Sequence, residues 1–145
     1  MNVRRAEAAD LDAITALALE LWPDHEYEEL WDDLADIMSG PEAAFFLLME
    51  NEEAVGFAQC QLRHDYVEGT ETSPVGYLEG IYVKEYAREQ GFASRLMKAC
   101  EDWARVQGCM EFASDCELDN EESLAFHLKL GFKEANRIIC FTKTL

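Results

Sequence analysis

The sequence has no long hydrophobic run: no apolar stretch approaches the roughly 20 residues that a membrane-spanning helix needs. Arg4 and Arg5 near the N-terminus are not followed by the apolar stretch of a secretory signal, so we predict a cytoplasmic protein that does not contact a membrane. The five cysteines include no Cys-x-x-Cys pair, which argues against a zinc site and a disulfide framework. We interpret them as small buried hydrophobic residues and expect no metal.

Basic residues are also scarce. Twelve Lys and Arg stand against 30 Asp and Glu, which gives a net charge of −18. Proteins that bind nucleic acid need a basic surface to displace counterions, so this balance excludes that class. No Lys or Arg lies between Arg5 and Arg63, a stretch with 15 acidic residues. This half of the chain suits a cationic partner, although a negative surface that only keeps the protein soluble explains the charge equally well.

The residues that are present suffice for one domain. A chain of 145 residues buries about 68–70% of the surface that its unfolded form exposes, so it can build a core of its own. The composition is 49% hydrophobic and 29% charged, which is typical of a globular protein. The sequence contains only three prolines and no internal repeat or low-complexity segment. We therefore predict a single domain over residues 1–145.

Hydrophobic periodicity predicts an α/β (α+β) fold. Apolar residues recur at helical spacing in four segments, and shorter apolar or alternating runs predict strands. The expected helices cover residues 11–21 (capped by Asp10), 24–39, 92–106 (with Gly108 just past its end) and 119–131 (starting with a capping box of Asp119 and Glu122). The expected strands cover residues 1–5, 43–50, 54–63, 75–83, 110–116 and 137–142. Because several strands follow one another as hairpins, we expect a central mixed, mostly antiparallel sheet flanked by four helices.

One segment has the pattern of an anion site. The strand over residues 75–83 leads through a turn to Gly91, where the third helix begins. Backbone N–H groups at a helix N-terminus, unobstructed at a glycine, bind phosphate groups. Four of the 12 cations lie within 15 residues here, namely Lys84, Arg88, Arg95 and Lys98. A pyrophosphate suits this segment, although an ordinary tight turn explains the glycine equally well.

Two motifs in this order resemble the GNAT superfamily of N-acetyltransferases. Arg88-x-x-Gly91-x-Ala93, after a strand that ends at Val83, is similar to the acyl-CoA pyrophosphate loop of that family. Asn120, followed by residues 125–132 with their Leu-Gly-Phe turn, is similar to its closing helix. Further segments resemble the aminoglycoside 6′-N-acetyltransferases, so that the likeness extends from Met1 to Phe141; these segments are residues 21–23, 63–69, 73–75, 78–81 and 113–115.

The resemblance implies acetyl-CoA as co-substrate. Backbone groups of Ile81, Tyr82 and Val83 are expected to bind the pantetheine arm, because an exposed strand edge pairs with amide groups as with another strand. Asn120 matches a pantetheine-binding asparagine of the family. The residues expected around the pyrophosphate are Arg88, Glu89, Gln90, Gly91, Phe92, Ala93 and Ser94.

The resemblance also implies three catalytic candidates. Glu79 and Asp115 fall on strands beside the expected acetyl site, where a carboxylate holds an ammonium group and accepts the proton that the amine must lose. His127 occupies a position where many relatives have a tyrosine that protonates the departing thiolate. A histidine, with an ordinary pKa near ~6.5, suits that task, but one that only lines the pantetheine channel is an equal alternative.

Acceptor-site positions of the family correspond to Trp22, His25 and Tyr66, together with Glu79 and Asp115. Aromatic faces suit an aminosugar, whose ammonium groups bind π-systems; for Trp22, packing beside the following proline is the alternative. Asn136 lies where relatives often have an acid, a role for which Glu134 is a substitute.

These expectations together predict transfer of an acetyl group from acetyl-CoA to the 6′-amine of a cationic aminoglycoside, an antibiotic-resistance activity, by direct attack in a ternary complex. The alternatives are a GNAT enzyme that acetylates a polyamine or a protein amine, and a non-catalytic acyl-CoA-binding domain. The resemblance and the apolar last strand also predict a homodimer.

Overall fold

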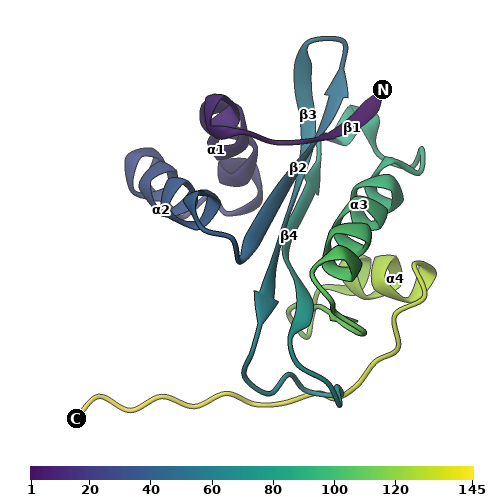
Figure 1. Cartoon of the computed structure of the whole chain (residues 1–145). Helices are drawn as coiled ribbons and strands as arrows, with labels where there is room; N and C mark the ends of the chain where they lie inside the picture. The colour runs from purple at the N-terminus through teal and green to yellow at the C-terminus, as the bar shows by residue number, and fades with distance from the viewer.

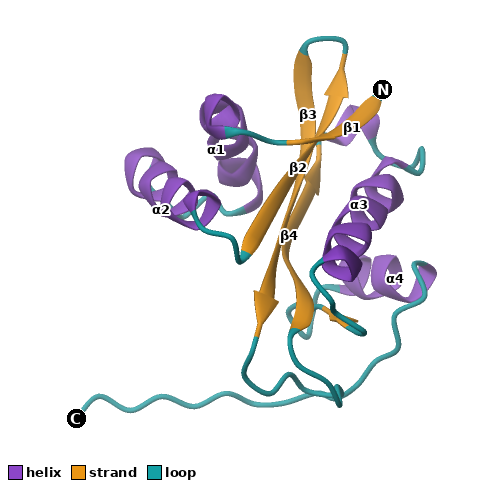
Figure 2. Ribbon diagram, in the orientation of Figure 1, coloured by secondary structure: helices purple, strands orange, loops and turns teal.

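A five-stranded sheet lies between two pairs of helices in the computed structural model, which describes all 145 residues. Helices α1 and α2 cover one face, and α3 and α4 lie on the other (Figure 1; Figure 2). The helices are α1 (Leu11–Leu21), α2 (Tyr27–Ser39), α3 (Phe92–Val106) and α4 (Glu121–Lys129), with short 3-10 turns η1 (Ala8–Asp10) and η2 (Glu85–Ala87). The strands are β1 (Asn2–Arg5), β2 (Ala43–Glu50), β3 (Glu53–Arg63), β4 (Val75–Val83) and β5 (Phe112–Ala113).

The strands follow their order in the chain, β1-β2-β3-β4-β5. The first three pairs are antiparallel, and only β4 and β5 run parallel. The expected mixed, mostly antiparallel sheet with four helices is therefore confirmed.

Alternation along β2 gives the molecule two cores. Phe45 and Leu47 pack with α1 and α2, whereas Ala44 and Leu48 pack with α3 on the opposite face. Because successive side chains of a strand point to opposite faces, a central strand covered on both faces is apolar almost throughout. The nearly continuous apolar run of β2 follows from this position in the middle of the sheet.

Strand β4 has two irregularities that define the site. It pairs with β5 only at Gly76 and Tyr77, so the rest of that edge, residues 78–83, has no strand beside it. On its other side, the partner of Gln59 is Gly80 but that of Cys60 is Leu78. Glu79 is therefore the extra residue of a β-bulge, which bends the strand and changes the direction of its side chain.

The predicted helix caps are only partly confirmed. Asp10 is the N-cap residue of α1, as predicted, but its side chain does not cap that helix: its carboxylate accepts hydrogen bonds from Arg4 and from the backbone N–H of Glu7. At α4 the cap is Asn120 rather than Asp119, and its Oδ1 accepts from the N–H of Ser123 at 3.0 Å. Asp10 thus bonds to a backbone N–H that precedes the helix, and at α4 the next residue in the chain takes the capping position.

Two predicted strands also differ. Only Phe112 and Ala113 of the expected strand 110–116 join the sheet. Residues 137–142 pair with no strand, and the C-terminal segment passes below the ends of β3 and β4 and projects away from the body (Figure 1). A strand forms only where it pairs with a neighbouring edge, and residues 137–142 pair with none of the five strands.

Three of the five cysteines are buried as expected, whereas Cys116 and Cys140 are exposed; all five are free thiols. No helix is both long and apolar enough to cross a membrane.

We expect Leu48→Ala to lower the free energy of unfolding by about 2–5 kcal/mol, because Leu48 is fully buried between β2 and α3 and its truncation leaves a cavity. Denaturant unfolding followed by circular dichroism measures this. Val106→Ala is the control: Val106 is 82% exposed, and its change is expected to stay within about 0.5 kcal/mol. Equal losses in the two variants would contradict the assigned core.

Candidate active site

The N-terminus of α3 is an open anion-binding position. Gly91 is its N-cap residue with φ 81°, in the left-handed region that favours glycine. No side chain caps this helix and no acidic residue lies in its first turn, so its first N–H groups have no partner from the helix or a cap. A Cβ atom at Gly91 would meet nothing within 4 Å. The helix dipole and these N–H groups favour a phosphate here.

The expected cation cluster is only partly directed at this position. Arg88 remains at the loop, where its Nε donates to the carbonyl of Val83 at 2.7 Å and its guanidinium lies 5.3 Å from the ring centre of Tyr82. The other three cations contact groups elsewhere: Lys84 with Glu53, Arg95 with the carbonyl of Met1, and Lys98 with Asp102. Backbone groups and Arg88 therefore provide most of the anion site.

The open edge of β4 and this helix terminus follow each other in the chain, joined by η2. Unpaired backbone groups of residues 78–83 can bind amide groups, as an added strand would. The N-terminus of α3 can bind a pyrophosphate at the end of that edge. These residues fit an elongated ligand with both features, such as acetyl-CoA.

His127 lies across from the end of β5 on α4. Its Nδ1 donates to the carbonyl of Ser123 at 2.7 Å, because a carbonyl only accepts, and its Nε2 lies 2.7 Å from the hydroxyl of Ser114. The neutral ring therefore carries its proton on Nδ1 and accepts from Ser114 at Nε2. Phe132 packs edge-on against the ring at 5.2 Å. The side chain is thus held in one orientation beside Ser114, the neighbour of Asp115.

Trp22 covers the middle of β4. It ends α1, and a Cβ atom at Gly80 would lie 2.6 Å from its ring atoms Cη2 and Cζ2. Only a glycine allows the indole this close to the strand, one residue after Glu79. Phe57 and His25 lie edge-on to it at 6.1 and 6.5 Å between ring centres. The Trp22 ring can therefore both pack against its neighbours and offer an aromatic face to a ligand, the two roles expected for it.

Glu79 and Asp115 belong to one network with two further residues. Arg63, at the end of β3, donates to the Glu79 carboxylate through Nε at 3.0 Å and Nη2 at 2.9 Å. The same guanidinium lies 3.4 Å from the ring centre of Tyr77, whose hydroxyl donates to Asp115. Burial, together with the Asp115 carboxylate, raises the pKa of Tyr77, so the phenol keeps its proton. The network thus joins β3, β4 and the end of β5.

Gln59, on β3 four residues before Arg63, has a buried polar atom without a partner. Gln59 is 5% exposed and donates from Nε2 to Gln61 at 3.2 Å, but its Oε1 has no hydrogen-bond partner. It pairs in the sheet with Gly80, the residue that Trp22 covers. A buried acceptor without a donor is costly, and a ligand that supplies a donor would satisfy it.

The remaining acceptor candidates lie apart from this network. His25 and Tyr66 are exposed, and Tyr66 accepts from the N–H of Gly69 at 3.4 Å. Asn136 is exposed and donates to Glu68 at 2.8 Å. Glu134, the expected substitute, is paired with Arg137. These assignments therefore stay predictions.

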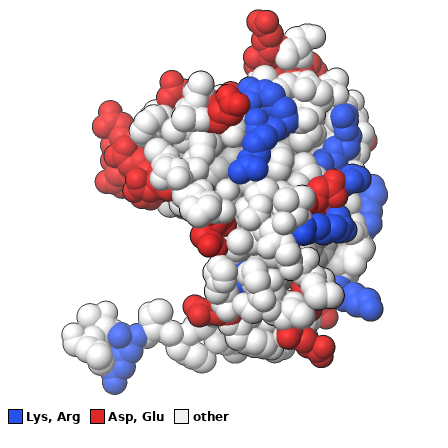
Figure 3. All heavy atoms as spheres, viewed as in Figure 1, with Lys and Arg blue, Asp and Glu red and all other residues white.

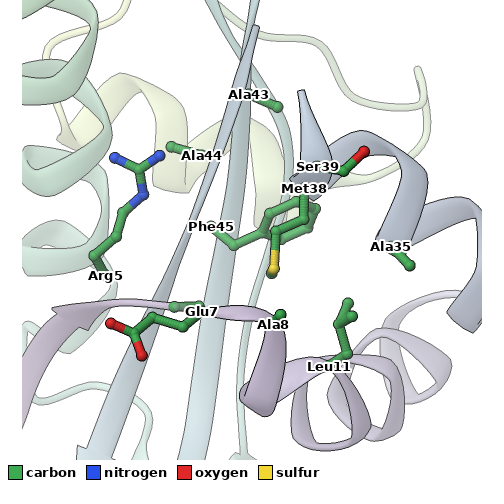
Figure 4. Close-up of a pocket in the computed structure, with 11 residues that line it drawn as sticks. Arg5, Glu7, Ala8, Leu11, Ala35, Met38, Ser39, Ala43, Ala44 and Phe45 are labelled. Atoms are coloured by element: carbon green, nitrogen blue, oxygen red, sulfur yellow. The ribbon is translucent and has the colours of Figure 1, made fainter. Parts of the chain in front are cut away.

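A pocket of about 270 Å³ opens elsewhere, between η1, the end of α2 and the start of β2 (Figure 4). Its lining is mostly apolar, with Arg5 and Glu7 as the charged residues, and none comes from β4, β5, α3 or α4. It is therefore separate from the groups described above. No group of three or more His, Cys, Asp or Glu side chains is arranged to hold a metal ion.

Comparison with models of protein families agrees with acetyl-CoA as a ligand of this protein. The model of the acetyltransferase (GNAT) family matches residues 9–132, most of the chain. The chain belongs to the GNAT acetyltransferase family. The family expected from the phosphate loop and the closing helix is confirmed, and with it an acyltransferase.

Similar curated proteins and solved structures include one narrower group within this family, the aminoglycoside 6′-N-acetyltransferases. The chain is 43% identical to an aminoglycoside N(6′)-acetyltransferase type 1 of Serratia marcescens, with 94% of each chain covered. It is 42% identical to one of Stenotrophomonas maltophilia, covering 99% of this chain and 94% of that one. Among solved structures, AAC(6′)-Iy in complex with the bisubstrate analogue CoA-S-monomethyl-acetylneamine has a TM-score of 0.95 at 36% identity, with 99% and 98% coverage. The expected resemblance to aminoglycoside 6′-N-acetyltransferases is therefore confirmed.

Sequence reasoning did not single out Arg63, Tyr77 or Gln59, which the structure places around Glu79 and Gly80. A signal existed for Arg63, which is the first basic residue after a stretch with 15 acids. Tyr77 and Gln59 lie within ordinary strand patterns, and nothing in the sequence separates them from structural residues.

We expect Gly91→Val to raise the KM for acetyl-CoA on the order of tenfold or more, because a side chain there obstructs approach to the N–H groups of α3. Steady-state kinetics with varied acetyl-CoA measures this. Gly108→Val is the matched control, since Gly108 at the other end of α3 has φ 91° and equally open space. Both variants pay a similar backbone strain of roughly 1–2 kcal/mol. An unchanged KM in a folded Gly91→Val variant would remove the loop from the cofactor site.

Proposed function

We propose that the chain transfers the acetyl group of acetyl-CoA to the 6′-amino group of aminoglycosides, and so confers resistance to them. The observation that supports this most is the network that joins Glu79 and Asp115 through Arg63 and Tyr77 near the open edge of β4, with the Trp22 ring packed on Gly80, the residue after Glu79. Carboxylates next to an aromatic face suit an ammonium-bearing sugar. The curated relatives named above carry this activity in their names.

Binding of the co-substrate involves the groups on one side of β4. The N-terminus of α3 and Arg88 hold the pyrophosphate, and the backbone of residues 81–83 binds the pantetheine amides. Acetyl-CoA supplies the thioester that is attacked. In this proposal the thioester lies in the gap between β4 and β5, near the Glu79 bulge, and the acceptor approaches it from the Trp22 side.

The acceptor must lose a proton before it attacks. Glu79 or Asp115 attracts the 6′-ammonium group and then accepts its proton, directly or through water. The free amine attacks the thioester carbonyl in a ternary complex, the C–N bond forms, and the C–S bond breaks. The acidic surface over α1 and α2, seen at the left of Figure 3, steers polycationic acceptors toward the site.

The departing thiolate needs a proton or leaves without one. His127 is the candidate acid, and its Nε2 is engaged with the Ser114 hydroxyl. The neutral ring has its proton on Nδ1 and none on Nε2, so transfer through Ser114 to the thiolate sulfur requires the doubly protonated imidazolium, which donates from Nε2 and returns to the neutral ring. Asn120, whose Oδ1 caps α4, retains a free amide group for the pantetheine arm.

A thiol-release assay with tobramycin, spermidine and a basic peptide tests the proposal against the alternatives. Turnover with tobramycin alone supports it, together with reduced susceptibility of cells that express the protein. Turnover only with spermidine or the peptide identifies a polyamine or protein acetyltransferase instead. Binding of acetyl-CoA without any turnover indicates a non-catalytic domain.

We expect Glu79→Gln and Asp115→Asn to lower kcat/KM for tobramycin by about a hundredfold where the carboxylate takes the proton. A raised KM with unchanged kcat identifies a carboxylate that only holds the acceptor. Glu28→Gln and Asp32→Asn on the exposed side of α2 are the controls; they remove the same charge at a distance and change turnover little. Wild-type kinetics in both near-site variants would show that the acceptor site lies elsewhere.

We also propose that the protein acts in the cytoplasm, where acetyl-CoA is available, and that it is a homodimer. Large exposed apolar residues concentrate in the last third of the chain, and the C-terminal segment carries Ile138, Ile139 and Phe141 at 68%, 80% and 87% exposure. Extended apolar backbone without a partner pairs readily with a second chain. A second copy of the protein covers this segment in our proposal.

Light scattering at micromolar concentration is expected to give a mass near twice that of one chain. Ile139→Asp places a charge in the contact, so we expect it to shift the mass toward that of a monomer without loss of helical circular dichroism. Leu118→Asp, at a comparably exposed site outside the tail, is the control. A monomeric wild-type protein would contradict the proposed dimer.

A further inference from the structure

Arg63 is an isolated cation in an acidic region. Between Arg5 and Lys84 it is the only Lys or Arg of the chain. Its guanidinium nevertheless binds the Glu79 carboxylate and lies over the ring of Tyr77, while part of the side chain stays exposed to solvent. The side chain is 41% exposed and that of Glu79 is 20% exposed. The residue thus occupies the position that the proposed function assigns to the ammonium group of the acceptor.

The contacts have the form expected of a ligand. Two nitrogens of Arg63 donate to Glu79, with Nη2 reaching both carboxylate oxygens at 2.9 and 3.0 Å. The guanidinium lies 3.4 Å from the centre of the Tyr77 ring, in the way that the cation of a ligand packs on an aromatic side chain of its binding site. Its Nη1 makes no hydrogen bond. Glu79 is therefore already neutralised by a cation that belongs to the chain itself.

The charges of the network are consistent with an exchange of one cation for another. Glu79 and Asp115 contribute two negative charges and Arg63 one positive charge, so the network carries a net charge of −1. An ammonium group that joins Glu79 while Arg63 stays would place two cations on one carboxylate. If the ammonium group replaces Arg63, the net charge is preserved.

Arg63 is also placed so that it can leave. It is the last residue of β3, and the polar loop of residues 64–74 follows it. A long side chain at a strand end, partly exposed, reaches water by rotation about its own bonds. Exposed ion pairs are weak, so the exchange is accessible to an incoming polycation.

We propose that Arg63 is a resident cation of the acceptor site, which the ammonium group of the acceptor displaces from Glu79, and that it thereby sets the affinity for the acceptor. The inference rests on the proposed function. It makes Arg63 a specificity-determining residue: acceptors bind productively when they bring a cation that competes with a guanidinium fork. No bond to Arg63 forms or breaks in the acetyl transfer.

The variant Arg63→Gln removes the competitor. We expect the KM and the calorimetric Kd for tobramycin to fall by about three- to tenfold, because the lost ion pair is a partly exposed one. We expect kcat to stay within about twofold. With the acceptor bound, the Arg63–Glu79 ion pair is broken in the wild-type protein and missing in the variant, so the two bound states are alike at Glu79. Arg63→Lys keeps the charge but loses the fork, and gives an intermediate value.

Two controls separate this exchange from a structural role. Arg4 and Asp10 form a similar two-nitrogen ion pair at 2.8 and 2.7 Å, with exposures of 40% and 17%, far along the chain from the site. Arg4→Gln therefore matches the loss of stability, measured by thermal unfolding, but leaves the tobramycin KM unchanged. In the double variant Arg63→Gln, Glu79→Gln the gain in affinity disappears, because the exchanged carboxylate is gone.

An unchanged or raised Kd for tobramycin in Arg63→Gln overturns the inference, and so does an equal gain in the double variant. A fall in kcat with unchanged KM also overturns it, and identifies Arg63 as a residue that positions Glu79. Failure of the proposed function looks different: the wild-type protein then neither binds nor acetylates tobramycin, whatever residue 63 is.

Discussion

The parting of β4 from β5 is the constraint on which the site depends. The two strands share only Gly76 and Tyr77, so the remaining edge of β4 keeps its backbone groups free. That edge leads directly through η2 to the N-terminus of α3, where Gly91 leaves more backbone N–H groups free. Free donors and acceptors are costly inside a protein and are tolerated where a ligand satisfies them. In a GNAT acetyltransferase the ligand that fits this row of groups is acetyl-CoA, so the proposed cofactor site and the proposed position of the thioester both depend on one irregularity of the sheet.

The bulge at Glu79 determines what lies on the other side of β4. An extra residue re-aims the side chain, and the glycine that follows allows Trp22 to approach the strand. The direction of the Glu79 side chain and the position of the indole on Gly80 therefore depend on two adjacent backbone features. Arg63 and Tyr77 then connect Glu79 to Asp115, although these two acids lie 36 positions apart in the sequence. The acceptor side is thus a connected network rather than a set of independent charges.

Much of the fold could be predicted because it depends on local patterns. The predicted helices and the strands β2 to β4 agree with the structure to within a few residues, since hairpins and amphipathic helices are determined by neighbouring residues. The short β5 and the C-terminal segment could not be predicted, because a strand needs a distant partner edge that the sequence does not reveal. The start of α3 at Gly91 was predictable from that glycine and its neighbours, whereas its binding of a phosphate stays a prediction. The network was not predictable, because a bulge shifts the register by one residue, and that shift decides which side chains meet.

Net charge alone gives an incomplete account of how such a site selects cations. A charge of −18 attracts any polycation at long range, but screening limits this attraction to about 8 Å at physiological ionic strength. Discrimination must therefore come from groups at contact distance. There Arg63, the first basic residue after the acidic stretch, is paired with Glu79 and packs on the ring of Tyr77. In our proposal the surface attracts cations, and the contact network determines which of them can replace Arg63. Weak binding of the resident cation and strong steering by the surface thus have complementary effects, since the first preserves selectivity while the second maintains the rate of encounter.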